Sequence, residues 1–214
     1  MKKIGILGSG MVAITLGAGF IKHGYEVMLG TSDASKLADW QTKNDGKVGS
    51  FSEAAAFGEM VVLAVKGIHA ESALQRAGLE NLAGKTILDA TNPIDESRGP
   101  VNGVLPFFTD LNQSLMERLQ AAAPSANFVK CFSCVGNHLM IDPQLPGGPP
   151  SMFIAGNSAE AKQETTALLH EIGWEVEDMG AAEAARAIEP LCILWCIPGF
   201  KDNKWGHAFK LLKP

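Results

Sequence analysis

Short apolar runs alternate with amphipathic segments through most of the chain. The runs are rich in Val, Ile and Leu and end at glycine or polar residues: KIGILG (3–8), YEVMLG (25–30), MVVLAV (60–65), KTILDA (85–90) and NFVKCF (127–132). Near-continuous apolar runs of this length are typical of parallel strands that are buried on both faces. A shorter strand is predicted near 47–50.

The segments between these runs have the composition of helices. They are MVAITLGAGFIKHG (11–24), DASKLADWQTKN (33–44), SEAAAFGE (52–59) and HAESALQRAGLENLAG (69–84). Strands that alternate with helices predict βαβ units. The fold class is therefore predicted as α/β, a Rossmann-like doubly wound and mostly parallel sheet with a small C-terminal extension.

After residue 90 the alternation loosens. Two loops rich in Pro and Gly, at 91–112 and 141–151, flank a predicted helix at 114–123 and the run at 127–132. Long loops in compact domains often bind ligands. Beyond the second loop the pattern predicts four elements: a strand at 152–156, an amphipathic helix at 158–173, a strand at 174–179, and a buried helix at 181–196 that Pro190 kinks or restarts.

Length and composition limit the class of protein. The 214 residues are 46% hydrophobic and 19% charged, which is enough apolar material for one large domain. We expect a Rossmann domain at 1–155 and an α/β extension at 156–214 packed on the same domain. The net charge of −5 argues against a nucleic-acid partner. No apolar run is long enough for a signal peptide or a bilayer span, which predicts a cytoplasmic chain without membrane insertion.

The four cysteines are spaced as Cys131-x2-Cys134 and Cys192-x3-Cys196. This spacing allows a metal site. However, the first pair lies in a predicted strand and its exit, where odd spacing sends the side chains to opposite faces. The second pair lies in an apolar run, where helical spacing places both on one buried face. We therefore predict reduced cysteines that fill the core.

A glycine-rich turn follows the first apolar run. Gly8, Gly10 and Ala13 form the pattern G-x-G-x-x-A between a predicted strand and a predicted helix. Gly8 permits the tight turn, Gly10 lets the backbone approach a pyrophosphate, and Ala13 lets the helix pack on the strand. The start of the helix offers free N–H groups for phosphates. The sequence predicts a dinucleotide site here.

The exit of the second strand indicates which dinucleotide binds. An acid at this position would bind the ribose hydroxyls of NAD, but the chain has Gly30, Thr31 and Ser32, with Lys36 further on. Small hydroxyls and a lysine suit a 2′-phosphate, although Lys36 is also compatible with an ordinary surface lysine. Asp33 is interpreted as the N-cap of the next helix. NADP is favoured over NAD.

Several motifs in this order resemble the NADP oxidoreductase family typified by the NADPH-dependent reductase of the deazaflavin coenzyme F420, and the similar reductase domains of the STEAP type. The motifs are GSGMVA, GTS-x3-K, VVLAV, DATNP, VKCFSCVGNHLMIDP and AARAIEPLCILW, and they cover nearly the whole chain. The resemblance implies that NADP(H) lies over Ser9, Gly10, Met11 and Val12, with its 2′-phosphate at Thr31, Ser32 and Lys36.

This sequence departs from the family pattern at three places. The usual arginine after the hydroxyl residue is absent, because Ser32 and Asp33 occupy those positions. Ser133 stands where the family has asparagine, and Cys131 stands where it has alanine. The first departure bears on the preference for NADP, and the other two bear on contacts with the acceptor.

The nicotinamide half of the cofactor is expected at the exits of the fourth, fifth and sixth strands, since ligands lie beyond the carboxyl ends of parallel strands. These exits supply Ala64, Val65, Lys66, Asn92, Pro93, Val135 and Gly136. Asn92 is interpreted either as a ligand of the carboxamide or ribose, or as half of an Asn-Pro turn. Lys66 either meets an anionic acceptor or phosphate, or extends to water.

No acid–base constellation is visible in the sequence. His69 and His138 are candidates for a general acid, or else cap helices and make ordinary hydrogen bonds, so no catalytic residue is assigned. Hydride transfer to a flavin-like ring needs alignment more than a strong acid. We predict an NADP-dependent oxidoreductase that transfers a hydride between NADP(H) and a deazaflavin, a flavin or another small redox-active acceptor under the two proline-rich loops.

Two alternatives stay open. One is an imine or carbonyl reductase resembling pyrroline-5-carboxylate reductases, and the other is a non-enzymatic NADP(H)-binding sensor. The tail at 197–214 carries Trp205, Phe209, Leu211 and Leu212 in an amphipathic pattern. It is predicted to pack on the core or across a second copy of the chain, so a homodimer is among the expected assemblies.

Overall fold

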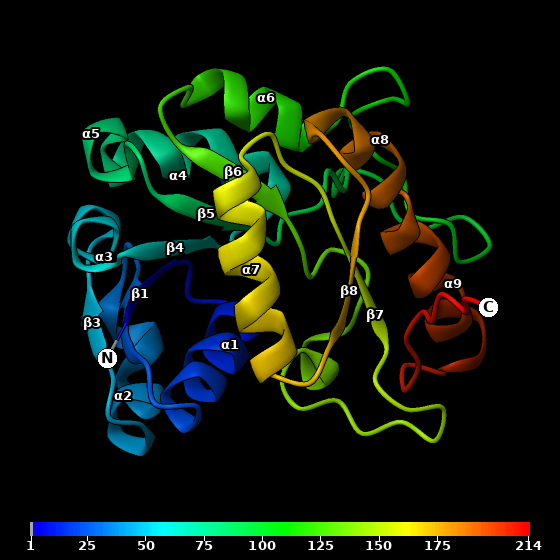
Figure 1. Cartoon of the computed structure of the whole chain (residues 1–214), viewed down its shortest axis with the longest axis horizontal. Coiled ribbons are helices and arrows are strands. Elements are labelled where there is room, and N and C mark those ends of the chain that lie inside the picture. The colour runs from blue at the N-terminus through cyan, green and yellow to red at the C-terminus, as the bar shows by residue number, and fades with distance from the viewer. Residues whose placement is uncertain (1) are drawn as a thin grey trace.

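The computed structural model describes residues 2–214. Its centre is a six-stranded sheet in the order β3-β2-β1-β4-β5-β6, in which every neighbouring pair is parallel (Figure 1). The strands are β1 Lys3–Leu7, β2 Glu26–Gly30, β3 Lys47–Gly49, β4 Met60–Leu63, β5 Thr86–Asp89 and β6 Asn127–Lys130. The predicted fold class is confirmed, including the short third strand.

Helices cover both faces of the sheet. They are α1 Met11–Lys22, α2 Ala38–Lys43, α3 Phe51–Phe57, α4 Ala70–Ala77, α5 Leu79–Leu82, α6 Leu115–Ala122, α7 Ala159–Glu171, α8 Ala185–Ile188 and α9 Leu191–Asp202. One core cluster joins α1 and α7 to the sheet, and a second joins α3, α4 and α6 to the opposite face. Ser50 and Ser114 start α3 and α6 with capping boxes, in which each serine bonds the third residue of its helix.

Two of the predicted helices are divided in the structure, the first against the prediction and the second in agreement with it. The helix expected over 69–84 is split, because Gly78 adopts a φ of 81° between α4 and α5, a conformation that favours glycine. The helix expected over 181–196 is also split, with Pro190 between α8 and α9. Pro190 therefore restarts the helix, which is one of the two outcomes predicted from the sequence.

The C-terminal part adds a second, two-stranded sheet. Strands β7 Ser151–Ile154 and β8 Glu175–Asp178 pair in parallel, as the sequence predicted for both segments. An isolated bridge between Lys130 and Ala155 joins this pair to the end of β6. Figure 1 shows β7 and β8 beside β6, with α8 and α9 beyond them. The domain boundary at 155 stays a prediction.

The tail packs on α9 and β7. The Trp205 ring lies against Gly199 and its centroid is 5.6 Å from that of Trp195. Further on, the Phe209 carbonyl accepts a hydrogen bond from the Ser151 N–H. The expectation that the tail packs on the core is confirmed for these residues, whereas Leu212 is 84% exposed and makes no part of that packing.

Within residues 2–214 no helix is both long and apolar enough to cross a membrane.

Candidate functional site

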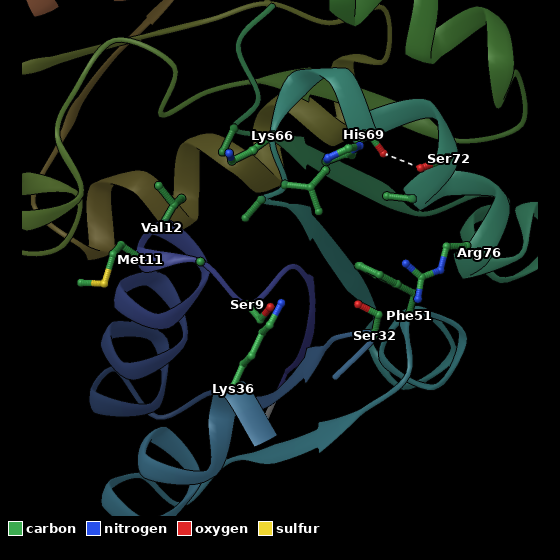
Figure 2. A pocket seen from close by; sticks show the side chains of 15 residues that line it. Ser9, Met11, Val12, Ser32, Lys36, Phe51, Lys66, His69, Ser72 and Arg76 are labelled. Carbon is green, nitrogen blue, oxygen red and sulfur yellow. Dashed lines mark hydrogen bonds between the residues drawn. The ribbon is translucent and has the colours of Figure 1, made fainter. Parts of the chain in front are cut away.

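A cavity of about 680 Å³ lies at the carboxyl ends of β1, β2 and β4 (Figure 2). The strand order reverses between β1 and β4, and ligands of open α/β sheets bind at such a switch point. Nine residues predicted from the sequence line the cavity: Ser9, Gly10, Met11, Val12, Ser32, Lys36, Ala64, Val65 and Lys66. It is also lined by Phe51, His69, Ser72, Ala73, Arg76 and Ala90.

The glycine-rich turn forms the floor of this cavity. Gly8 has a φ of 148°, and a Cβ added there would lie 2.3 Å from the Ala64 carbonyl oxygen, so only glycine fits. A Cβ on Gly10 would meet no protein atom within 4 Å. Helix α1 has neither a side-chain cap nor an acidic residue in its first turn. The turn therefore leaves uncovered N–H groups and open space, which fits a pyrophosphate.

At the exit of β2, some residues stabilise the loop and others line the cavity. Thr31 is 7% exposed, and its hydroxyl lies 3.1 Å from Ser9 Oγ and accepts from the Asp33 N–H, so it joins the two loops without lining the cavity. The Asp33 carboxylate accepts from the Ser35 hydroxyl at 2.6 Å and from the Ser35 N–H at 3.1 Å. These hydrogen bonds lower the pKa of Asp33, and they confirm it as an N-cap. Ser32 and Lys36 remain on the cavity wall.

The opposite wall carries two residues that the sequence analysis missed. The Arg76 guanidinium lies 4.5 Å from the centroid of the Phe51 ring, and Figure 2 shows both beside Ser32. A signal for Arg76 was present, because His69, Ser72 and Ala73 precede it at helical spacing and share its face of α4. This spacing predicts a helix, but it does not indicate which element the face of the helix packs against.

The other end of the cavity is less polar. Ala64, Val65 and Ala90 line it, and Lys66 Nζ pairs with Glu96 Oε2 at 2.8 Å, with both side chains largely exposed. Lys66 thus has a carboxylate partner, and its role toward an anionic acceptor or phosphate stays a prediction. His69 lines the cavity from the start of α4, whereas His138 is exposed outside it.

Four of the predicted nicotinamide residues lie beyond the cavity wall. They are Asn92, Pro93, Val135 and Gly136. Asn92 Nδ2 donates to the Ser133 carbonyl at 2.8 Å, while Asn92 Oδ1 and Ser133 Oγ are buried without a partner. Asn92 thus joins the β5 and β6 exits, and its roles toward the carboxamide or ribose stay predictions.

Aromatic side chains stand behind the β6 exit. A Cβ on Gly136 would lie 2.7 Å from the Trp195 ring and 2.9 Å from the His138 ring. Trp195 Nε1 donates to the His207 carbonyl at 2.7 Å, and the two rings stack with centroids 5.1 Å apart. The tail is therefore bound to α9 at a point directly next to this exit.

A buried group of charges lies under the β5 and β6 exits. Lys130 Nζ contacts Asp89 Oδ2 at 2.7 Å and Glu189 Oε1 at 2.9 Å, and it donates to the Thr91 carbonyl at 2.8 Å. The side chains of all three charged residues are at most 2% exposed. Burial opposes the charged form, but the two carboxylates outweigh it and raise the pKa of Lys130. The sequence analysis did not anticipate this group.

All four cysteines are buried free thiols, as expected of core residues. Burial raises the pKa of Cys134 to about 12 and that of Cys131 well above its usual value, so neither is a reactive thiolate. The structure corrects one detail, because β6 ends at Lys130 and Cys131 follows the strand. Within residues 2–214 no three His, Cys, Asp or Glu side chains are grouped to hold a metal ion.

Known proteins resemble this chain in sequence and in structure. The family model described as NADP oxidoreductase, coenzyme F420-dependent, matches residues 3–93. The crystal structure of a proposed F420-dependent NADP-reductase from Arthrobacter sp. FB24 is 33% identical, covers 100% of both chains and has a TM-score of 0.92.

Two further matches are more distant. Metalloreductase STEAP3 of Rattus norvegicus is 29% identical over 201 residues, which are 92% of this chain and 38% of that relative. This chain therefore spans well under half of STEAP3. A reductive aminase from Aspergillus terreus, solved with NADPH, is 17% identical with a TM-score of 0.67 over 93% of this chain and 62% of that one, a likeness of fold alone.

Proposed function

The chain belongs to the family of coenzyme F420-dependent NADP oxidoreductases, and we propose that it transfers a hydride between NADP(H) and a deazaflavin or flavin ring. The observation that carries the proposal is the charge of the cavity. Its lining includes Lys36 and Arg76, which have no carboxylate partner among the described residues, and Lys66, which pairs with Glu96; no lining residue is a carboxylate. A dinucleotide with an additional phosphate is the ligand that suits such a lining.

Residues of the glycine-rich turn and the β2 exit are proposed to hold the cofactor. The backbone at Ser9, Gly10 and Met11 would receive the pyrophosphate, because Gly10 leaves open space there and α1 begins without a cap. Ser32 and Lys36 would receive the 2′-phosphate. Thr31 supports this wall through its hydrogen bond to Ser9.

The other end of the cavity is proposed to align the reacting rings. When bound, NADPH supplies a hydride from its nicotinamide. Val12, Ala64, Val65 and Ala90 offer apolar surface that keeps water away from this ring. Asn92 and Gly136 are proposed to border the carboxamide and the acceptor from the neighbouring exits.

Among the described residues that line the cavity, His69 is the one histidine, the side chain that most often acts as a general acid. Reduction of an imine or carbonyl group requires such an acid, whereas hydride transfer to a flavin-like ring does not depend on it. The chain covers 62% of the reductive aminase, so the fold likeness does not extend to that whole enzyme. The imine reductase and the NADP(H) sensor are kept as alternatives, and the cytoplasmic location and the homodimer stay predictions.

The test is anaerobic oxidation of NADPH by the purified protein with F420, FMN, FAD and small quinones in turn. We expect rapid oxidation with one class of ring, and His69→Gln should retain that rate within about threefold, because no proton transfer limits it. Turnover with imines or carbonyls alone, lost in His69→Gln, would favour the first alternative. NADPH binding without turnover of any acceptor would favour the sensor.

A further inference from the structure

We propose that Arg76, held over the Phe51 ring, recognises the 2′-phosphate of NADP(H) from helix α4 and so replaces the arginine missing after Ser32. The proposal rests on the proposed binding of NADP(H) in this cavity. It adds a specificity-determining residue on the wall opposite the β2 exit.

The β2 exit alone provides little for a phosphate to bind. Asp33 stands where an arginine would have provided a fork of donors, and its Oδ1 accepts two hydrogen bonds from Ser35. What remains is the Ser32 hydroxyl and the Lys36 ammonium. An ammonium is a point charge on a flexible stem, whereas a guanidinium binds phosphate with two parallel hydrogen bonds.

Arg76 is in a position to supply that fork. It lies in the last turn of α4 on the face that lines the cavity. Its guanidinium is 4.5 Å from the Phe51 ring centroid, which is cation–π distance. Phe51 is 7% exposed and opens α3 directly after the Ser50 capping box, so the ring is a fixed platform. In Figure 2 Arg76 and Phe51 lie beside Ser32.

The charge partners of the arginines support the same assignment. The chain has four arginines, and Arg98, Arg118 and Arg186 each pair with a carboxylate. Within residues 2–214 no carboxylate lies within salt-bridge distance of Arg76, and the same holds for Lys36. Arg76 and Lys36, each without a carboxylate partner among the described residues, therefore stand on opposite walls of one cavity, with Ser32 between them.

This arrangement has a consequence for selectivity. Because the exposed guanidinium lies over the Phe51 ring and has no carboxylate partner, its N–H groups are left for the ligand. NAD lacks the 2′-phosphate and gains none of these charge-assisted hydrogen bonds. Preference for NADP should therefore depend on Arg76 at least as much as on Lys36.

The experiment measures binding, not turnover, with NADPH, NADH, adenosine 2′,5′-bisphosphate and AMP as titrants in calorimetry. Arg76→Met should weaken NADPH and the bisphosphate by roughly 10-fold to 100-fold, the range expected for hydrogen bonds to a charged group. NADH and AMP should change by less than about threefold, because they make no such bonds. Arg76→Lys should recover part of the loss, and Arg98→Met, an exposed arginine outside the cavity, should have no effect.

Three results would count against the proposal. Unchanged NADPH affinity in Arg76→Met would overturn it, while leaving the proposed function intact. Equal weakening of NADPH and NADH would also overturn it, because Arg76 would then contact the adenosine and not the phosphate. Failure of the unmodified protein to bind NADPH would overturn the proposed function itself. Thermal unfolding of each variant checks that the exposed Arg76 is not needed for folding.

Discussion

Two regions at the carboxyl edge of the sheet hold cations in opposite circumstances. Lys130 is fully buried and touches two carboxylates and a carbonyl. Lys36 and Arg76 are exposed, line the cavity and have no carboxylate partner among residues 2–214. A buried charge needs partners within the protein, because burial removes its water. An exposed charge stays hydrated and can pair with a ligand. A charged side chain that is paired inside the protein therefore indicates a role in stabilising the fold. A charged side chain that lines a cavity without a partner indicates a role in ligand binding.

The buried region explains two of the motifs in the sequence. Glu189, in AARAIEP, accepts from the Leu115 and Met116 N–H groups at the start of α6 while it pairs with Lys130 of VKCF. Arg186, in the same motif, bonds Glu117 of α6. These residues fix α8 and α6 to the sheet beneath the β5 and β6 exits.

Removal of Lys130 should give the largest effect and tests the buried side of the comparison. In Lys130→Met, Asp89 and Glu189 would remain buried without their cation, so the free energy of unfolding should fall by about 3–5 kcal/mol. Urea denaturation measures it. Lys2→Met removes a lysine that is 63% exposed and paired at 3.9 Å, and should cost less than about 1 kcal/mol. If both variants lost the same free energy of unfolding, the proposed difference between buried and exposed cations would be wrong.

The two glycines of the phosphate turn should differ in what they contribute. Alanine at Gly8 should lower the stability of the fold, whereas alanine at Gly10 should weaken NADPH binding. Gly8→Ala places a Cβ 2.3 Å from the Ala64 carbonyl oxygen at a φ of 148°, and should destabilise the fold by about 2 kcal/mol or more. Gly10→Ala meets no protein atom, so its melting temperature should hardly change. The same variant should weaken NADPH binding, because its methyl group enters the space proposed for the pyrophosphate. Intact NADPH affinity in Gly10→Ala would contradict the proposed site.

A smaller effect is expected for the pair that joins the buried region to α6. Hydrogen bonds from Arg186 lower the pKa of Glu117 to about 2, against an ordinary value of 4.5. A lowered pKa adds stability above pH 4.5 that is lost as the pH falls from 4.5 through 2. Glu117→Gln should flatten this part of the stability profile by about 1 kcal/mol, since the pair is partly exposed. Chemical denaturation at several pH values measures it, and an unchanged acid slope would rule out the contribution.

The sheet was predictable because its strands are continuous apolar runs with glycine or polar ends. Even the three residues of β3 were anticipated at the correct place. The internal break of the helix at 69–84 was not, because Gly78 in a helical pattern is tolerated as often as it ends a helix. Burial pattern alone does not distinguish the two cases.

The site residues that belong to one local motif were predictable from the sequence. The residue that reaches the site only when two helices pack together was not. Gly8, Gly10 and Ser32 follow from the local pattern of the phosphate turn and the β2 exit. Arg76 resembles any exposed arginine on a helix, and its position over Phe51 arises only when α4 packs beside α3. Lys130 likewise lies in an apolar run, and its neighbours in the sequence do not predict that it pairs with Asp89 and Glu189.

The position of Glu189 late in the chain also determines when the buried group of charges can form during synthesis. Until residue 189 has been made, Lys130 has one carboxylate in place of two, and the first N–H groups of α6 lack their acceptor. The residues that line the cavity lie between positions 9 and 90, so they leave the ribosome well before Glu189 does. The nascent chain therefore carries every residue of the cavity lining before it can neutralise the charge buried beside it.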